Sequence, residues 1–340
     1  MSTSAPVRRS SRLEHLDFLR GLGAILICLC HFELAFPSQF HAWLMKFGEV
    51  GVFSFFLISG FIMPRVMSKE KYRLAKFGTF MARRLARLHP PYLAALALTL
   101  VASLAAAAWK GQPTTWNASD LVPFFFYLDW PAENPVFWTL QVEMCFYIFI
   151  ALTYGLFNSP NALFRWSAFA LGIVLWLTYP QLVFFRVIAF FLVGVALEQF
   201  QRGVVGRTEF VAKMLIGCGM VWMTRGLENL PLGPISVLSC LAISAFIVRP
   251  PAIPGAPLFL WLGSISYPLY LVHFPFGVKL INLSLAKAPF LPPLLIAATA
   301  ILFSVVVAWL IHRYVERPGM RWSASIGAPQ REAPVMAKVQ

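Results

Sequence analysis

The stretch HLDFLRGLGAILICLCHF, residues 15–32, decides the fold of this chain, because it is apolar almost throughout yet carries Asp17, Arg20 and His31. Arg20 and His31 are eleven residues apart. Each residue of an α-helix turns by about 100° and rises about 1.5 Å, so the two side chains would share one face roughly 16 Å apart. Asp17, three residues before Arg20, joins that face. Ionisable groups inside a membrane helix are costly, which makes all three candidates for function.

The composition is that of a polytopic membrane protein. Of the 340 residues, 59% are hydrophobic and only 12% are charged, whereas a soluble domain of this length needs far more polar surface. The first apolar run is too long for a signal peptide, so we expect it to be retained as a membrane span. The five cysteines lie in apolar runs without the spacing of zinc ligands, and we expect no bound metal.

Apolar runs of about 17–25 residues predict an all-α bundle of about ten transmembrane helices. The predicted spans are residues 16–36, 44–64, 91–109, 136–157, 163–179, 183–200, 209–225, 231–249, 262–282 and 292–312. The expected domains are a cytoplasmic basic N-terminus (1–12), a transmembrane domain (13–318) and a cytoplasmic tail (319–340).

Basic residues are divided unequally between the two ends of these spans. With the N-terminus inside, the inner segments hold 20 of the 28 Lys and Arg residues, the outer segments hold four, and the other four lie within spans. An excess of positive charge marks the cytoplasmic side, so both termini are predicted to be cytoplasmic. Orientation and anionic membrane lipids then account for much of the net charge of +14, without a nucleic-acid partner.

A pair of arginines follows the most basic inner segment, in RRLARLHPPY (83–92). Arg84 and Arg87 are three residues apart and would share a helix face at the cytoplasmic surface. Guanidinium groups suit the geometry of phosphate oxygens, which favours a phosphate-bearing ligand. Anchoring of the chain by positive charge alone would also explain the pair.

Other polar side chains lie within the later apolar runs. Glu143 is buried early in the fourth predicted span and needs a partner, either His31 or an arginine, in a site or a structural ion pair. Tyr267, Tyr270 and His273 follow one another at spacings of three and share one face, where they line a polar cavity or bond to other helices. By contrast, we interpret the histidines at helix ends as ordinary interfacial residues: His15, His41 and His312.

Six short segments occur in a particular order along residues 12–320: LDFLRG (16–21) followed by His31, FFLISGF (55–61), RLARLHP (84–90), WTLQVE (138–143), SYPLYLVH (266–273) and VERP (315–318). Each segment is weak alone, but the ordered set resembles the bacterial membrane acyltransferase 3 family. Thr139 departs from that pattern, because serine is common at its position.

The resemblance implies transfer of an acyl group, usually acetyl, from cytoplasmic acyl-CoA to a carbohydrate hydroxyl at the bacterial inner membrane. It implies that His31 is catalytic, that Arg84 and Arg87 meet the CoA phosphates, and that acyl-CoA is a co-substrate rather than a bound cofactor. Many relatives carry a soluble hydrolase-like domain after the last span, and we expect this chain to end too soon to contain one. The acceptor, any partner protein and homo-oligomer formation stay open.

The residues suggest a compatible mechanism. The arginines, Arg20 included, would hold the phosphate head of acyl-CoA at the inner face while the thioester reaches inward toward His31. A neutral imidazole there serves either as general base or as a transient acyl carrier. Glu143 or Asp17 would orient the ring, and backbone donors or the two tyrosines would stabilise the oxyanion.

A secondary transporter is the main alternative, because buried His, Arg and carboxylate groups also form proton relays and substrate sites. Against it, the sequence has no detectable inverted repeat. A non-catalytic scaffold would leave the buried charges of the first span without a purpose.

The charge distribution makes a testable prediction about topology. A reporter that is active only in the cytoplasm, fused after Gln340, should be active, and one that is active only outside should be silent. The opposite pattern would contradict the predicted cytoplasmic C-terminus.

Overall fold

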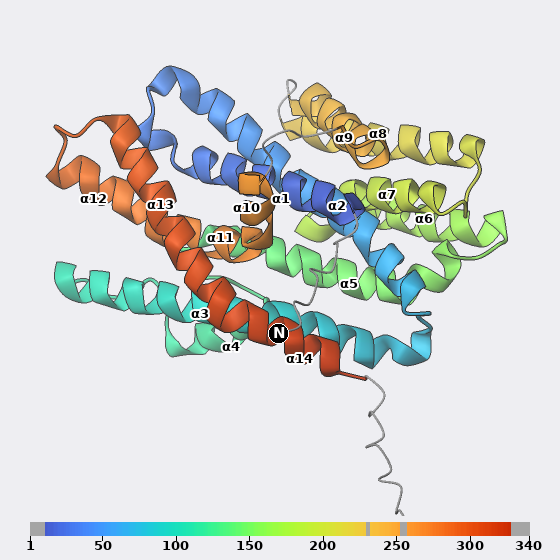
Figure 1. The fold of residues 1–340 in the computed structure, drawn as a ribbon, viewed down its shortest axis with the longest axis horizontal. Helices are drawn as coiled ribbons and strands as arrows, with labels where there is room; N and C mark the ends of the chain where they lie inside the picture. The colour runs from blue at the N-terminus through green and yellow to red at the C-terminus, as the bar shows by residue number, and fades with distance from the viewer. Residues whose placement is uncertain (1–10, 229–231, 252–256, 328–340) are drawn as a thin grey trace, which may run out of the picture.

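The structure, a computed structural model, describes residues 11–228, 232–251 and 257–327, and in these ranges the chain is helical with no β-strand (Figure 1). The predicted all-α class is confirmed. The predicted N-terminal segment before residue 11 and the tail after residue 327 lie outside the described residues. The α-helices are α1 (Ser11–His31), α2 (His41–Lys69), α3 (Phe77–Lys110), α4 (Leu121–Phe125), α5 (Trp138–Phe157), α6 (Ala162–Thr178), α7 (Val183–Gln201), α8 (Arg207–Glu228), α9 (Leu232–Val248), α10 (Pro257–Ser264), α11 (Ser266–Val272), α12 (Lys279–Lys287), α13 (Pro293–Ile311) and α14 (Arg317–Ser325).

The chain is a multi-pass membrane protein. Within the described ranges, six helical stretches are long and apolar enough to cross a membrane: Ser38–Lys69, Leu74–Lys110, Pro135–Phe157, Val183–Gln201, Ser266–Lys287 and Pro293–Ser325. Helices α6 and α9 are apolar but shorter, at 17 residues each. The ten predicted runs are largely helical, but the count of about ten spans is not confirmed.

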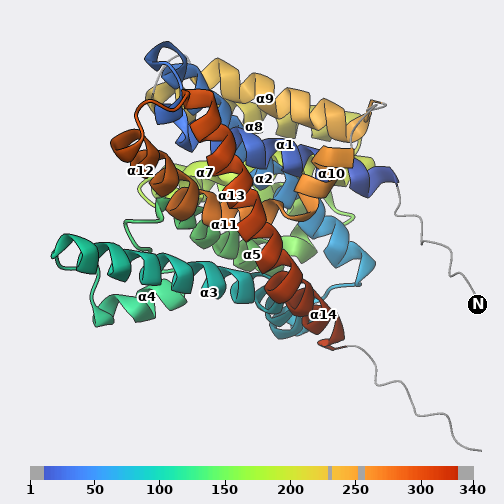
Figure 2. The same cartoon turned by 60° about the vertical axis from the view of Figure 1, so that its left-hand side comes forward.

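The helices are arranged around a central group formed by α1, α2, α5, α7 and α11 (Figures 1 and 2). Helices α3 and α4 lie at one edge of the molecule, and α8 and α9 lie at the opposite edge. Helix α13 runs obliquely across the bundle, and α14 continues it to pack against α3.

The predicted span 262–282 is not one continuous helix. Helix α11 passes into a π-helical segment, η6 (His273–Val278), before α12 begins. Pro275 has no N–H to donate to the carbonyl of Leu271, four residues earlier. The side-chain amide of Asn134 donates to that oxygen instead, across 3.0 Å. The proline therefore interrupts the α-helical bonding pattern without ending the helical stretch, and a residue from another part of the chain completes the bonding. The span itself is divided at Ile265, between α10 and α11.

Helix α3 is longer than the predicted span 91–109. It begins at Phe77 and therefore includes the arginine segment as well. Pro90 and Pro91 lie inside it without ending it. Such prolines are tolerated in membrane helices when neighbouring groups cover the altered backbone. Here α14 provides the cover: a Cβ placed on Gly319 would lie 2.8 Å from the carbonyl oxygen of Ala86.

Helices α2 and α7 touch backbone to backbone. A Cβ placed on Gly60 would lie 2.2 Å from the carbonyl oxygen of Phe191, and one on Gly194 would lie 2.2 Å from the carbonyl oxygen of Leu57. Small residues at such crossings allow the dense packing that holds membrane helices together. These two glycines therefore fix the distance between α2 and α7.

We predict that Gly60→Ala lowers the apparent melting temperature of the purified protein in detergent. Overpacking of this kind costs about 1–3 kcal/mol. Gly155→Ala on α5 is the matched control, because a Cβ there would meet no atom within 4 Å and alanine in a helix is favoured over glycine by about 0.5–1 kcal/mol. Equal melting temperatures for the two variants would contradict the close contact of α2 and α7.

Candidate functional site

A cavity of about 570 Å³ lies between α1, α2, α3, α5, α11 and the junction of α13 with α14. Seven of the nine predicted site residues line it: Asp17, Arg20, Arg84, Arg87, Glu143, Tyr267 and Tyr270. His31 and His273 are not among the lining residues. The predicted groups thus separate into a cavity and a histidine pair.

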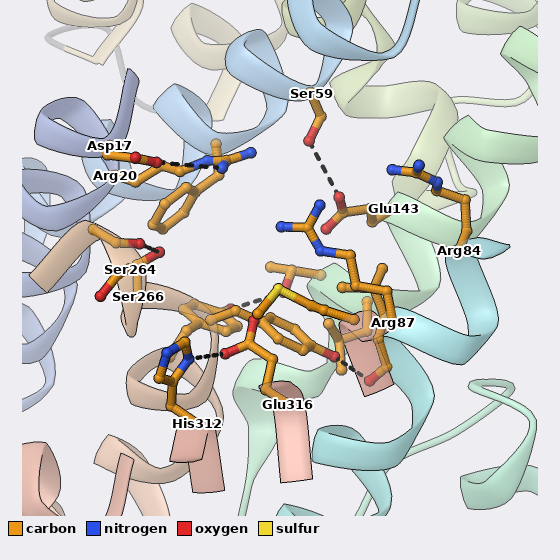
Figure 3. A pocket seen from close by; sticks show the side chains of 18 of the residues that line it. Asp17, Arg20, Ser59, Arg84, Arg87, Glu143, Ser264, Ser266, His312 and Glu316 are labelled. Atoms are coloured by element: carbon orange, nitrogen blue, oxygen red, sulfur yellow. Dashed lines mark hydrogen bonds and ion pairs between the residues drawn. The ribbon is translucent and has the colours of Figure 1, made fainter. Parts of the chain in front are cut away.

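Close packing of α1 against α10 forms one wall of the cavity. A Cβ placed on Gly21 would lie 2.2 Å from the carbonyl oxygen of Phe259, and one on Gly263 would lie 1.9 Å from that of Asp17. This contact brings the charged turn of α1 beside the start of α11. In that turn Arg20 and Asp17 approach to 3.9 Å (Figure 3).

The arginines of α3 form the opposite wall. The guanidinium groups of Arg84, Arg87 and Arg20 point toward the middle of the cavity (Figure 3). Arg84 lies over the ring of Phe80 at 5.7 Å and contacts the sulfur of Met63 at 3.7 Å. The Nε atoms of Arg84 and Arg87 are buried without a hydrogen-bond partner, and neither group forms an ion pair within the described residues. Buried guanidinium groups left in this state favour the binding of an anion.

Glu143 reaches into the cavity between the arginines (Figure 3). Its carboxylate accepts hydrogen bonds from Ser59, across 3.2 Å, and from Tyr147 one turn along α5. The expectation that Glu143 or Asp17 orients the ring of His31 is wrong, because among the described residues the polar groups that contact this ring are the Ile27 carbonyl and His273. Sequence spacing gave no information about which helices would face each other.

His31 is half-buried at the last residue of α1 and lies beyond the cavity. Its Nδ1 is 3.0 Å from Nε2 of His273 and 3.1 Å from the carbonyl oxygen of Ile27. His273 is fully buried, so the expectation that it lines the cavity is wrong. Tyr270 separates the two regions: it lines the cavity, and its ring centroid is 5.7 Å from that of His273.

The two cavity tyrosines already use their hydroxyl protons. Tyr267 donates to the carbonyl of Leu88 on α3 across 2.8 Å, and Tyr270 donates to the carbonyl of Val136 across 2.8 Å. Thr139 lies 2.9 Å from the Tyr270 hydroxyl. Both tyrosines therefore join helices across the cavity, and the predicted oxyanion role does not follow from this geometry.

Sequence reasoning missed a second set of polar residues in the cavity. We predicted that His312 is an ordinary interfacial residue. The structure instead places it in the lining of the cavity, together with Glu316 and Arg317. The Nδ1 atom of His312 is 2.7 Å from a carboxylate oxygen of Glu316 (Figure 3). Both lie in η7 (His312–Glu316), a π-helical segment of the kind often found at functional sites. The VERP segment was the signal that pointed here.

Within the described ranges, no group of three or more His, Cys, Asp or Glu side chains is arranged to hold a metal ion. The expectation that no metal is bound stays a prediction.

Comparison with known proteins agrees with the order of the sequence segments. A family model described as an acyltransferase domain matches residues 13–313. The O-acetyltransferase OatA of Staphylococcus aureus (strain NCTC 8325 / PS 47) is 24% identical over 90% of this chain and 57% of its own length. The peptidoglycan O-acetyltransferase OatA of Listeria monocytogenes serovar 1/2a is 22% identical over 89% of this chain and 55% of its own length.

The chain thus spans little more than half the length of these curated relatives. No solved structure matches it. The family model, however, covers nearly the whole transmembrane region, including every polar group of the cavity except Glu316 and Arg317. The chain belongs to the membrane acyltransferase 3 family, as the order of its motifs predicts.

Proposed function

We propose that this protein is a membrane O-acetyltransferase that takes an acetyl group from cytoplasmic acetyl-CoA and transfers it to a carbohydrate hydroxyl outside the cytoplasm. One observation carries the proposal: a cavity of about 570 Å³ presents buried arginine nitrogens that have no protein partner. Its size lies within the range of small-molecule sites. The names of the relatives support acetyl as the group transferred and a cell-wall sugar as the class of acceptor.

The arginines of the cavity suit the head of acetyl-CoA. Its phosphates offer several anionic oxygens, and bidentate contacts to guanidinium groups are among the strongest charge-assisted hydrogen bonds. Arg84 and Arg87 come from a helix whose N-terminal part is predicted to face the cytoplasm, the compartment that supplies acyl-CoA. Tyr270 lines the cavity and its ring centroid lies 5.7 Å from that of His273, so the acyl-bearing arm would extend from the arginines toward the histidine pair.

His31 is the proposed catalytic residue. Its Nδ1 faces two acceptors, so Nε2 is the nitrogen left to react. As general base, Nε2 takes the proton of the acceptor hydroxyl, the oxygen forms the new C–O bond, the C–S bond breaks, and the CoA thiolate then receives the proton. In the acyl-histidine route, Nε2 forms a C–N bond to the acetyl carbon as the C–S bond breaks and CoA leaves as thiolate. The acceptor oxygen then forms the C–O bond as the C–N bond breaks, and the hydroxyl proton passes to the thiolate.

We predict that Arg84→Ala with Arg87→Ala weakens acetyl-CoA binding. Loss of one charge-assisted contact of about 1.5–3 kcal/mol lowers affinity roughly ten- to a hundredfold. The corresponding Lys pair should bind with intermediate affinity, because the charge remains but the bidentate geometry is lost. Affinity is measured by titration calorimetry in detergent.

Arg83→Ala is the matched control, because it removes a positive charge from the same helix outside the cavity lining. Arg83 pairs with Glu70 at 3.0 Å and donates to the carbonyl of Ile326. This variant should bind acetyl-CoA like the wild type. Equal affinities for all four proteins would leave the α3 arginines as topology signals only.

We predict that His31→Ala abolishes acetyl transfer without changing the affinity for acetyl-CoA, because His31 lies beyond the cavity. Loss of a general base lowers rates by about 10²–10⁴-fold. Transfer is followed in membrane vesicles as acetyl label on glycan and as free thiol released. Unchanged transfer would remove His31 from the mechanism, and absence of thiol release from the wild-type protein would favour a transporter.

A further inference from the structure

We propose that His273 is the positioning residue of His31: as a neutral hydrogen-bond acceptor, it holds the His31 ring with Nδ1 protonated and Nε2 free. This inference rests on the proposed catalytic role of His31. The geometry that points to it is the contact of 3.0 Å between His273 Nε2 and His31 Nδ1.

The protonation of His273 follows from its backbone neighbours. Its Nδ1 is 2.8 Å from the carbonyl oxygen of Tyr270 and 3.2 Å from that of Leu269. A carbonyl oxygen only accepts hydrogen bonds, so Nδ1 must carry the proton. In a neutral imidazole the other nitrogen, Nε2, then has a lone pair and accepts.

The protonation of His31 follows in turn. Its Nδ1 lies between two acceptors, Nε2 of His273 and the carbonyl oxygen of Ile27. Nδ1 therefore carries the proton, and Nε2 is left with a lone pair. In the described chain, Nε2 of His31 makes no hydrogen bond of its own. The unprotonated nitrogen is thus the one available to a reacting group.

The fold holds His273 firmly in place. Its side chain has no solvent exposure, and it opens the π-helical segment η6. This segment is pressed against the end of α1: a Cβ placed on Gly277 would lie 2.2 Å from the ring of Phe32, the residue after His31. The relative position of the two histidines is therefore fixed by the packing of the Phe32 ring against the backbone of Gly277.

Complete burial also decides which of the two rings takes up charge. A buried group without a counter-charge stays neutral, because removing a charge from water is costly. His31 is half-buried, so it is the ring that takes up the substrate proton. The imidazolium formed on His31 would donate through Nδ1 to the lone pair of His273, as a carboxylate accepts from the histidine of a hydrolase triad.

The test combines a spectrum with a rescue experiment. In protein labelled with 15N-histidine, the His31 signals are identified by their loss in His31→Ala. We expect Nδ1 of His31 to be protonated and Nε2 to be unprotonated. His41 is an internal reference for the opposite form, because its Nε2 is 2.8 Å from the carbonyl oxygen of Phe36 and must donate.

The variants separate positioning from packing. His273→Gln keeps an acceptor oxygen near the position of Nε2, whereas His273→Leu fills the space without one. We expect His273→Leu to lower kcat by about ten- to a hundredfold, the usual effect of losing an orienting partner, with KM for acetyl-CoA unchanged. His273→Gln should recover much of this loss, and His41→Gln should retain wild-type activity.

Two results would overturn the proposal: a wild-type spectrum in which His31 is protonated at Nε2, or equal activities for the Gln and Leu variants. The spectrum decides even if His273→Leu fails to fold. It does not depend on any activity, so a protein that proved not to be an acetyltransferase would still give a clear answer about the histidine pair.

Discussion

The backbone contact between α1 and α10 is the constraint on which the cavity depends. Gly21 and Gly263 leave no room for side chains between these helices, since a Cβ on Gly263 would lie 1.9 Å from the carbonyl oxygen of Asp17. Because α10 leads directly into α11, the same contact sets the position of Tyr267 and Tyr270. Any widening here would move the wall that faces the arginines of α3 and would detach the tyrosine bridges across the cavity.

Only some of the cationic side chains that line the cavity have a carboxylate neighbour. Arg20 and His312 each have a carboxylate neighbour within the cavity wall, Asp17 and Glu316. Glu143 is bonded to hydroxyl groups rather than to a cation. The α3 guanidinium groups and Arg317, which also lines the cavity, are therefore the cations without an ion pair among the described residues. A buried guanidinium group without a carboxylate partner lowers the stability of the protein, and binding of an anion would remove this cost.

Helical periodicity accounts for what the sequence predicted correctly. It gives the direction of each side chain around its helix, and it therefore placed Arg20, Arg84 and Arg87 in a polar site before their partners were known. Periodicity does not say which helices are neighbours. For that reason the sequence left His31 and an arginine as alternative partners of Glu143, although Tyr270 and His273 lie between the cavity and His31.

The remaining errors arise where the chain departs from a regular α-helix. The two histidines that were misplaced, His273 and His312, are the first residues of the π-helical segments η6 and η7. Regular α-helical spacing put His273 in the cavity lining, and a position near a helix end led to the interpretation of His312 as an interfacial residue. The bonding of such segments depends on distant residues: the amide of Asn134 completes the backbone at Leu271, 137 positions away. A local sequence pattern contains no record of such a partner.

The position of Tyr270 between the cavity and the histidine pair has a consequence for the membrane itself. A bacterial membrane stores energy as an ion gradient, and an aqueous path through a protein would dissipate it. Tyr270 is held by Val136 on one side and packs against the buried ring of His273 on the other. A buried tyrosine ring thus stands between the cavity and the histidine pair, and an open aqueous path from one to the other would require Tyr270 to move.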